Sequence, residues 1–163
     1  MPRFGPVMTA MVTPFDDAGE VDHDGAAQLA RWLVEQGNDA LVVTGTTGEA
    51  SCLTDDEQVA IWRTVREAVD VPILAGSGTN DTRHAAELIS RAAGAGIDAV
   101  LVVTPYYNRP AQSGIELHFR RVAAATELPV LLYDIPVRTG RQISQEVILR
   151  LAREVPNVVG LKD

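Results

Sequence analysis

Cysteine is nearly absent from this sequence, in which Cys52 is the single one among 163 residues. An internal disulfide is therefore impossible, and the composition fits a reducing compartment. Residues 1–6 contain no basic stretch followed by a long apolar run, so the sequence indicates neither a signal peptide nor a transmembrane span. We accordingly expect a cytoplasmic protein that does not associate with membranes.

Basic residues are fewer than acidic ones. The sequence has 14 Lys and Arg and 22 Asp and Glu, which gives a formal net charge of −8. This balance argues against nucleic acid and anionic membrane surfaces as partners. The three histidines, His23, His84 and His118, fall on different predicted helices. Since a metal site needs several such ligands close together, we expect no metal ion.

Short apolar runs recur about every 30 residues, separated by segments with apolar residues at helical spacing. An unbroken apolar run bounded by turn residues is typical of a parallel strand buried on both faces. The predicted strands are 7–13, 40–43, 72–75, 99–103, 129–133 and 158–161, the last leading into Lys162. The predicted helices are 23–36, 54–69, 81–95, 114–126 and 144–154, the second opening on a capping-box pattern from Thr54 to Glu57.

Alternating strands and helices are compatible with a doubly wound sheet or with a (β/α)8 barrel. No Gly-x-Gly-x-x-Gly follows the first strand, which weakens the dinucleotide-binding sheet, and the regular unit length favours the barrel. A complete barrel needs eight strands and roughly 250 residues. We therefore predict an α/β fold, a TIM barrel of which residues 1–163 carry about the first six βα units, as one partial catalytic domain truncated after the sixth strand.

The last predicted strand ends in Lys162. Burial disfavours the ammonium form, so it would lower the pKa of this amine and make the amine a usable nucleophile. The alternative is that the strand has ended and that Lys162 extends into solvent.

Other candidate groups fall on the loops after the predicted strands, where barrel enzymes keep their chemistry. Gly45, Thr46 and Thr47 begin a glycine-flanked turn whose hydroxyl and N–H groups suit a carboxylate; the alternative is an ordinary βα turn. Arg138 suits bidentate binding of a carboxylate, or else is a solvated surface arginine.

All three tyrosines also fall at these strand ends and loops. Tyr133 is placed to pass protons to and from a reacting oxygen, or else packs beneath a loop. Tyr106 and Tyr107 are candidates for burial against another subunit. A lysine amine accompanied by two anion-binding elements indicates attack on the carbonyl of a 2-oxo acid.

Four segments in this order carry a resemblance to one family: Gly45–Glu49, Pro105–Pro110, Tyr133–Gly140 and Gly160–Asp163. Together they resemble the signatures of the dihydrodipicolinate synthase / N-acetylneuraminate lyase family of pyruvate-dependent class I aldolases, over the whole chain. The resemblance implies a TIM-barrel lyase of diaminopimelate and lysine biosynthesis that needs no metal or organic cofactor.

The resemblance also implies how the substrates are used. Lys162 would form a Schiff base with pyruvate, whose carboxylate Gly45, Thr46 and Thr47 would hold. The derived enamine would add to the aldehyde of aspartate 4-semialdehyde, and cyclisation would release the lysine.

Further roles follow from the same likeness. Tyr133, Thr46 and Tyr107 would form a proton relay, with Tyr107 reaching into the site of a neighbouring subunit of a homotetramer, a dimer of dimers. Arg138 would receive the semialdehyde carboxylate. The alternatives are another pyruvate-dependent aldolase, of the N-acetylneuraminate lyase or sugar-acid type, and an inactive fragment that retains the motifs.

Three positions match the effector site of family members that lysine inhibits. Asn80 and Tyr106 are the residues expected there, whereas His84 stands where inhibited members have a glutamate. Asp55 stands where inhibited members have a histidine, and it adds a carboxylate that would offset the one missing at His84. The alternative is that His84 and Asp55 are solvated helix residues. Because an ammonium group loses a carboxylate partner at His84, we expect weak or absent inhibition by lysine.

Overall fold

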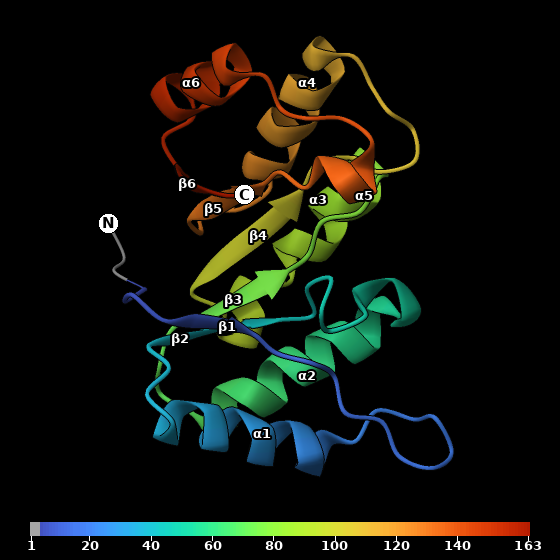
Figure 1. The fold of residues 1–163 in the computed structure, drawn as a ribbon, viewed down its shortest axis with the longest axis vertical. Coiled ribbons are helices and arrows are strands. Elements are labelled where there is room, and N and C mark those ends of the chain that lie inside the picture. Colours follow the sequence, from blue (N-terminus) through green and yellow to red (C-terminus); the bar gives the residue numbers. More distant parts are fainter. Residues whose placement is uncertain (1–3) are drawn as a thin grey trace. The chain divides into compact units, whose positions relative to one another are not determined.

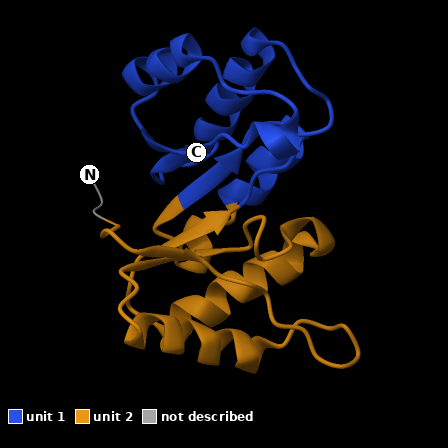
Figure 2. Cartoon of the chain, in the orientation of Figure 1, with its two compact units in different colours: residues 1, 77–90, 100–163 blue, residues 2–76, 91–99 orange. Residues whose placement is uncertain are grey.

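The computed structural model describes residues 4–163, which divide into two compact units. Unit 1 comprises residues 77–90 and 100–163, and unit 2 comprises residues 4–76 and 91–99 (Figure 2). Each unit alternates strands with helices, as the apolar periodicity predicted (Figure 1). No helix among residues 4–163 is long and apolar enough to cross a membrane.

Unit 2 consists of parallel strands covered by helices. Its elements are β1 (Met8–Ala10), α1 (His23–Glu35), β2 (Ala40–Val43), η1 (Ala50–Cys52), α2 (Asp55–Ala68), β3 (Ile73–Gly76) and η2 (Ala93–Ala95). The strand β2 pairs in parallel with both β1 and β3, so strand order follows chain order, as in a barrel. The predicted capping box at the start of α2 is confirmed, because the Thr54 side chain and Glu57 cap each other's backbone N–H groups.

Unit 1 repeats this arrangement. Its elements are α3 (Thr82–Ser90), β4 (Ala99–Val103, whose first residue belongs to unit 2), α4 (Gln112–Ala123), β5 (Val130–Tyr133), α5 (Pro136–Thr139), α6 (Gln145–Glu154) and β6 (Val158–Lys162). The strand β5 pairs in parallel with β4 and β6. The β5–β6 pairing shifts by one residue between Val130 and Leu131, so that Tyr133 lies opposite Lys162.

Three sequence predictions need correction. The helix expected over 81–95 ends at Ser90 and is followed by a separate 3-10 turn, since Gly94 and Gly96 disfavour helix there and Gly96 is left-handed with φ of 78°. The segment after β5 is not all loop, because α5 forms there. The last strand is not fully buried, for Leu161 is 42% exposed at the edge of the strands described.

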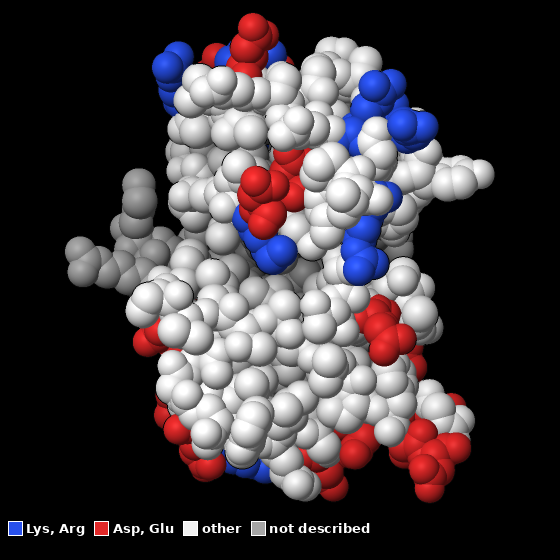
Figure 3. Space-filling model, viewed as in Figure 1, with Lys and Arg blue, Asp and Glu red and all other residues white. Residues whose placement is uncertain are grey.

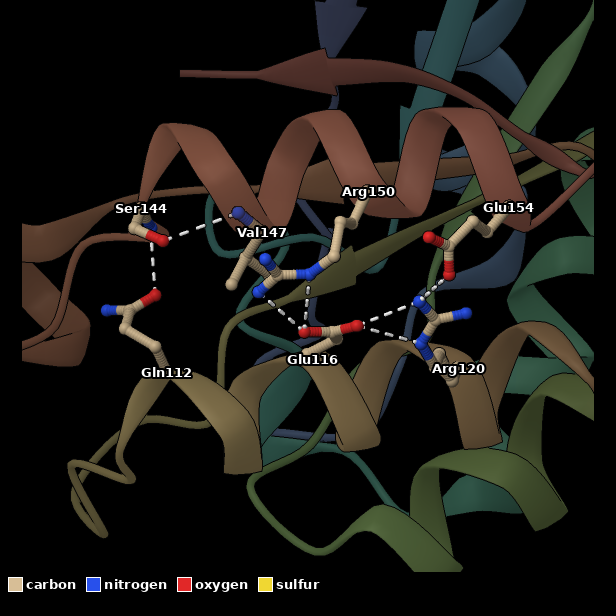
Figure 4. Close-up of polar contacts among 7 residues, drawn as sticks. All are labelled: Gln112, Glu116, Arg120, Ser144, Val147, Arg150 and Glu154. Carbon is tan, nitrogen blue, oxygen red and sulfur yellow. Dashed lines mark hydrogen bonds and ion pairs between the residues drawn. The ribbon is translucent and has the colours of Figure 1, made fainter.

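A polar network joins α4 to α6 on the surface of unit 1 (Figure 4). Glu116 accepts hydrogen bonds from Arg120 at 2.7 Å and from Arg150 at 2.9 Å, and Arg120 also reaches Glu154 at 2.6 Å. Arg150, and then Arg120, hold the pKa of the Glu116 carboxyl below its usual value. The network therefore fixes α6, which leads directly into β6.

A buried histidine links α3 to α4. His118 shares a hydrogen bond of 2.9 Å between its Nδ1 and the Thr82 hydroxyl, and its ring meets that of Phe119 edge-on. Its Nε2 has no hydrogen-bond partner among residues 4–163. Burial lowers the pKa of His118 to about 4, although the Val103 carbonyl opposes the shift.

This burial predicts acid sensitivity. Between about pH 6.5 and pH 4 the unfolded chain binds a proton at His118 that the folded chain does not, so stability falls as pH falls through that window. The expected loss reaches about 3 kcal/mol. Urea titrations at pH 7 and pH 4.5 should show a smaller pH effect for His118→Gln than for the unsubstituted protein. His23→Gln is the control, because His23 shares an exposed hydrogen bond with Thr64; equal pH effects in both variants would contradict the assignment.

Candidate active site

Lys162 and Tyr133 lie side by side at the carboxyl ends of β6 and β5. They are register partners, and the Lys162 Nζ lies 3.9 Å from the centroid of the Tyr133 ring. Tyr133 is 6% exposed, whereas Lys162 is half-buried. Lys162 is also the only lysine in the sequence. A strand-end amine and a phenol therefore lie together in unit 1.

Asp134 is a buried carboxyl group next to this pair that sequence reasoning missed. Its backbone N–H donates to the Lys162 carbonyl at 2.9 Å, and its Oδ2 accepts from the Ile143 N–H at 3.1 Å. Burial raises the pKa of Asp134, with the Ile143 N–H opposing and the charge of Asp163 adding to the rise. Asp134 thus joins the end of β6 to the far end of the loop that carries Arg138.

Arg138 and Tyr107 lie on two loops of unit 1, after β5 and β4 respectively. Arg138 is exposed in the single turn of α5, and Tyr107 is 88% exposed with a left-handed backbone, φ 66°. Exposure of this extent agrees with the expectation that Tyr107 acts outside its own subunit, which stays a prediction. Tyr106 is half-buried.

The predicted carboxylate-binding turn, Gly45 to Gly48, belongs to unit 2. Thr46 and Thr47 are exposed, and the turn is closed by hydrogen bonds from Glu49 N to the Thr46 carbonyl and from Ala50 N to the Gly45 carbonyl, each 3.3 Å. The turn leads into the 3-10 helix η1 and only then into α2. Both threonines are therefore accessible to solvent and to a small anion.

The buried residues just before this turn fix its position. Thr44 has a left-handed backbone, φ 50°, and its hydroxyl accepts a hydrogen bond of 2.7 Å from Trp62 Nε1 and donates to the Gly76 carbonyl at 3.1 Å. Gly76 packs so closely that a Cβ there would lie 2.6 Å from Gly45 Cα. The turn is consequently built on the ends of β2 and β3 together.

Of the expected effector positions, Asn80 lines a cavity of about 910 Å³ between α3 and α4 in unit 1, whereas His84 and Tyr106 are not among its lining residues. The Asn80 carbonyl accepts a hydrogen bond of 3.2 Å from the Asn108 side chain. Figure 3 shows basic side chains gathered on unit 1, while the visible face of unit 2 is mostly acidic or uncharged. Within residues 4–163, no cluster of three or more His, Cys, Asp or Glu could hold a metal ion.

Comparison with known proteins assigns the chain to a family. The model of the Dihydrodipicolinate synthetase family matches residues 3–163. The chain belongs to this family. Within it, the 4-hydroxy-tetrahydrodipicolinate synthase of Acidothermus cellulolyticus is 56% identical over 98% of this chain and 52% of that protein. The enzyme of that name from Bacillus subtilis is 47% identical over 99% of this chain and 56% of that protein.

Solved family structures show the same fold. The dihydrodipicolinate synthase DapA-2 of Bacillus anthracis is 45% identical and superposes over 100% of this chain and 56% of that one, with a TM-score of 0.97. The enzyme of Cyanidioschyzon merolae, solved with lysine bound, superposes with a TM-score of 0.96 at 46% identity, over 98% of this chain and 55% of that one. The chain therefore has the fold of the first six βα units of a TIM barrel and spans about half the length of these relatives, which confirms the predicted fold class.

The packing beneath the turn predicts that Gly76 tolerates no side chain. In Gly76→Ala the new Cβ would meet Thr44 and Gly45 backbone atoms at 2.6 Å, so the turn has to move. We expect a loss of about 1–3 kcal/mol in the free energy of unfolding, the usual effect of overpacking. The control is Gly94→Ala, because nothing lies within 4 Å of a Cβ at Gly94. Equal effects of the two substitutions in denaturant titrations would contradict the close packing.

Proposed function

We propose that this protein is a 4-hydroxy-tetrahydrodipicolinate synthase, which condenses pyruvate with L-aspartate 4-semialdehyde. The single observation that carries the proposal is the only lysine of the chain, held over Tyr133 at the end of β6. Membership of the family and the shared name of close relatives support it. Those relatives favour this activity over that of another pyruvate-dependent aldolase.

In the proposed reaction the neutral Lys162 amine attacks C2 of pyruvate. A C–N bond forms, the carbonyl oxygen leaves as water, and the protonated imine then withdraws electrons from the methyl group. Loss of a methyl proton gives an enamine, whose carbon attacks the aldehyde of the second substrate. The amine of that substrate finally adds to the imine carbon, closes the ring and expels Lys162.

Two further groups of residues serve this reaction in the proposal. Tyr133, 6% exposed and in contact with the lysine, moves protons together with Thr46 and with Tyr107 of a neighbouring subunit; general acid–base catalysis contributes typically about 10²–10⁴-fold. Gly45, Thr46 and Thr47 bind the pyruvate carboxylate, and Arg138 binds the semialdehyde carboxylate. The proposal includes a homotetramer, built as a dimer of dimers, in which a neighbouring subunit supplies Tyr107 to the relay. It also includes a cytoplasmic location.

Covalent trapping tests this function. Pyruvate followed by borohydride should leave one stable adduct at Lys162, located by peptide mapping. The only competing amine is the N-terminus, since the chain has no other lysine. Tyr133→Phe should keep the adduct yet turn over about 10²–10⁴-fold more slowly. An unmodified Lys162, or an adduct at the N-terminus alone, would refute the Schiff-base assignment.

Sensitivity to lysine is a separate prediction. His84 replaces a carboxylate that would pair with the ammonium of the effector, and a hydrogen bond to a charged group contributes typically about 1.5–3 kcal/mol. We therefore expect affinity for lysine to be about ten- to hundredfold weaker than in inhibited members. His84→Glu should restore inhibition in a steady-state titration. Half-inhibition of the unsubstituted enzyme at low lysine concentration, unchanged in His84→Glu, would show that the site does not depend on this position.

A further inference from the structure

Two neighbouring loops of unit 1 hold each other by reciprocal hydrogen bonds. Arg109, on the loop after β4, donates from Nε to the carbonyl of Gly140 at 3.3 Å, on the loop after β5. Arg141 donates from its own Nε back to the carbonyl of Arg109 at 3.2 Å. We call Arg109, Gly140 and Arg141 the clasp. Because each loop is both donor and acceptor, neither can shift without breaking both bonds.

The backbone of the clasp is specialised for this contact. Gly140 is left-handed, φ 69°, and a Cβ there would lie 2.8 Å from Arg109 Nε and 3.4 Å from Cδ and Cγ. Glycine suits this left-handed backbone, and a Cβ would in addition displace the Arg109 side chain from its bond to the Gly140 carbonyl. Arg109 is itself left-handed, φ 48°, a conformation that costs a non-glycine residue free energy and persists only where surrounding contacts hold it.

A second contact reinforces the same pair of loops. Gln112, the first residue of α4, donates from Nε2 to the Gln142 carbonyl at 2.8 Å. Its Oε1 accepts from the Ser144 N–H at 2.8 Å (Figure 4). Within the second loop, the Thr139 hydroxyl donates to the Arg141 carbonyl at 2.8 Å. The loop after β5 is therefore attached along its length to the segment after β4.

Each of these loops carries a residue of the proposed site two positions before the clasp. Tyr107 precedes Arg109, and Arg138 precedes Gly140. Because only two residues separate each of them from the clasp, the backbone conformation at the clasp also fixes the Cα positions of Tyr107 and Arg138. In the proposed tetramer the clasp consequently links Arg138, in the site of its own subunit, to Tyr107, which completes the proton relay of the neighbouring subunit.

We propose that Arg109, Gly140 and Arg141 are positioning residues that hold Tyr107 and Arg138 in a fixed relation to each other. This inference rests on the proposed function for its kinetic consequence, whereas its structural consequence stands alone. Loss of the clasp contacts then both weakens binding of the semialdehyde and slows proton transfer. We expect pyruvate capture by Lys162 to be unaffected, because the β5–β6 pairing and the Asp134 N–H that hold Lys162 precede the clasped part of the loop.

Hydrogen–deuterium exchange of the protein tests the structural consequence. Gly140→Ala and Arg109→Leu should each raise the exchange of amides in both loops, 105–110 and 136–144, by about five- to tenfold, as expected for loss of one or two hydrogen bonds. The matched controls are Gly37→Ala, which adds a Cβ to an equally left-handed glycine with nothing within 4 Å, and Arg153→Leu, which removes another exposed arginine. The controls should leave exchange in both loops unchanged.

Kinetics of the same variants test the catalytic consequence. For Gly140→Ala and Arg109→Leu we expect KM for the semialdehyde to rise about tenfold and kcat to fall, with KM for pyruvate and the borohydride adduct at Lys162 unchanged. Arg109→Lys keeps one hydrogen-bond donor, so its KM for the semialdehyde and its kcat should lie between those of the unsubstituted protein and those of Arg109→Leu. Faster exchange in the substituted loop alone, or kinetic changes no larger than in the controls, would overturn the clasp. Absence of the adduct in the unsubstituted protein would instead overturn the proposed function and leave the exchange result to decide the clasp.

Discussion

The pairing of β5 with β6 is the constraint on which the proposed site depends. Val130 lies opposite Val158, but one residue later Leu131 lies opposite Gly160, so β6 contains one extra residue at Val159. Without this irregularity Leu161 would face Tyr133, and Lys162 would lie one position beyond the pair. Since a one-residue slip exchanges the two faces of a strand, the bulge decides that an amine rather than an isobutyl group lies over the phenol ring.

The loops at the carboxyl ends of the strands are strained, and the strands are not. The non-glycine residues with a left-handed backbone within residues 4–163 are Thr44, Glu49, Tyr107 and Arg109, all on the loops after β2 and β4. Each such residue costs of order 1–3 kcal/mol. At Thr44 the buried hydrogen bonds to Trp62 and Gly76 offset that cost. Regular parallel strands that carry loops held in place by many contacts are the arrangement expected of a TIM-barrel fold.

The sequence predicted the elements well because their signals are local. Apolar runs located all six strands, and Thr54 with Glu57 marked the start of α2, since both patterns depend on residues close together in the chain. The bulge at Val159 was not predictable, because an additional valine in an apolar run does not alter its pattern. Sequence reasoning also missed the bond from the Ile143 N–H to Asp134, and it missed the clasp. In both cases the partners come from separate segments of the chain. The sequence gives no sign of which group a buried carboxyl or an exposed arginine will contact.

Thirteen of the fourteen basic side chains in this protein are arginines, and the remaining one is Lys162. A guanidinium group stays protonated at any pH the folded chain meets, so it attracts anions without attacking them. Dissolved aldehydes and 2-oxo acids therefore encounter a single ε-amine on the whole chain. In most proteins lysine supplies both positive surface charge and amines that react with carbonyl compounds. In this chain arginine supplies the charge and Lys162 alone supplies the amine, so glycation-like reactions have no other side-chain amine at which to begin.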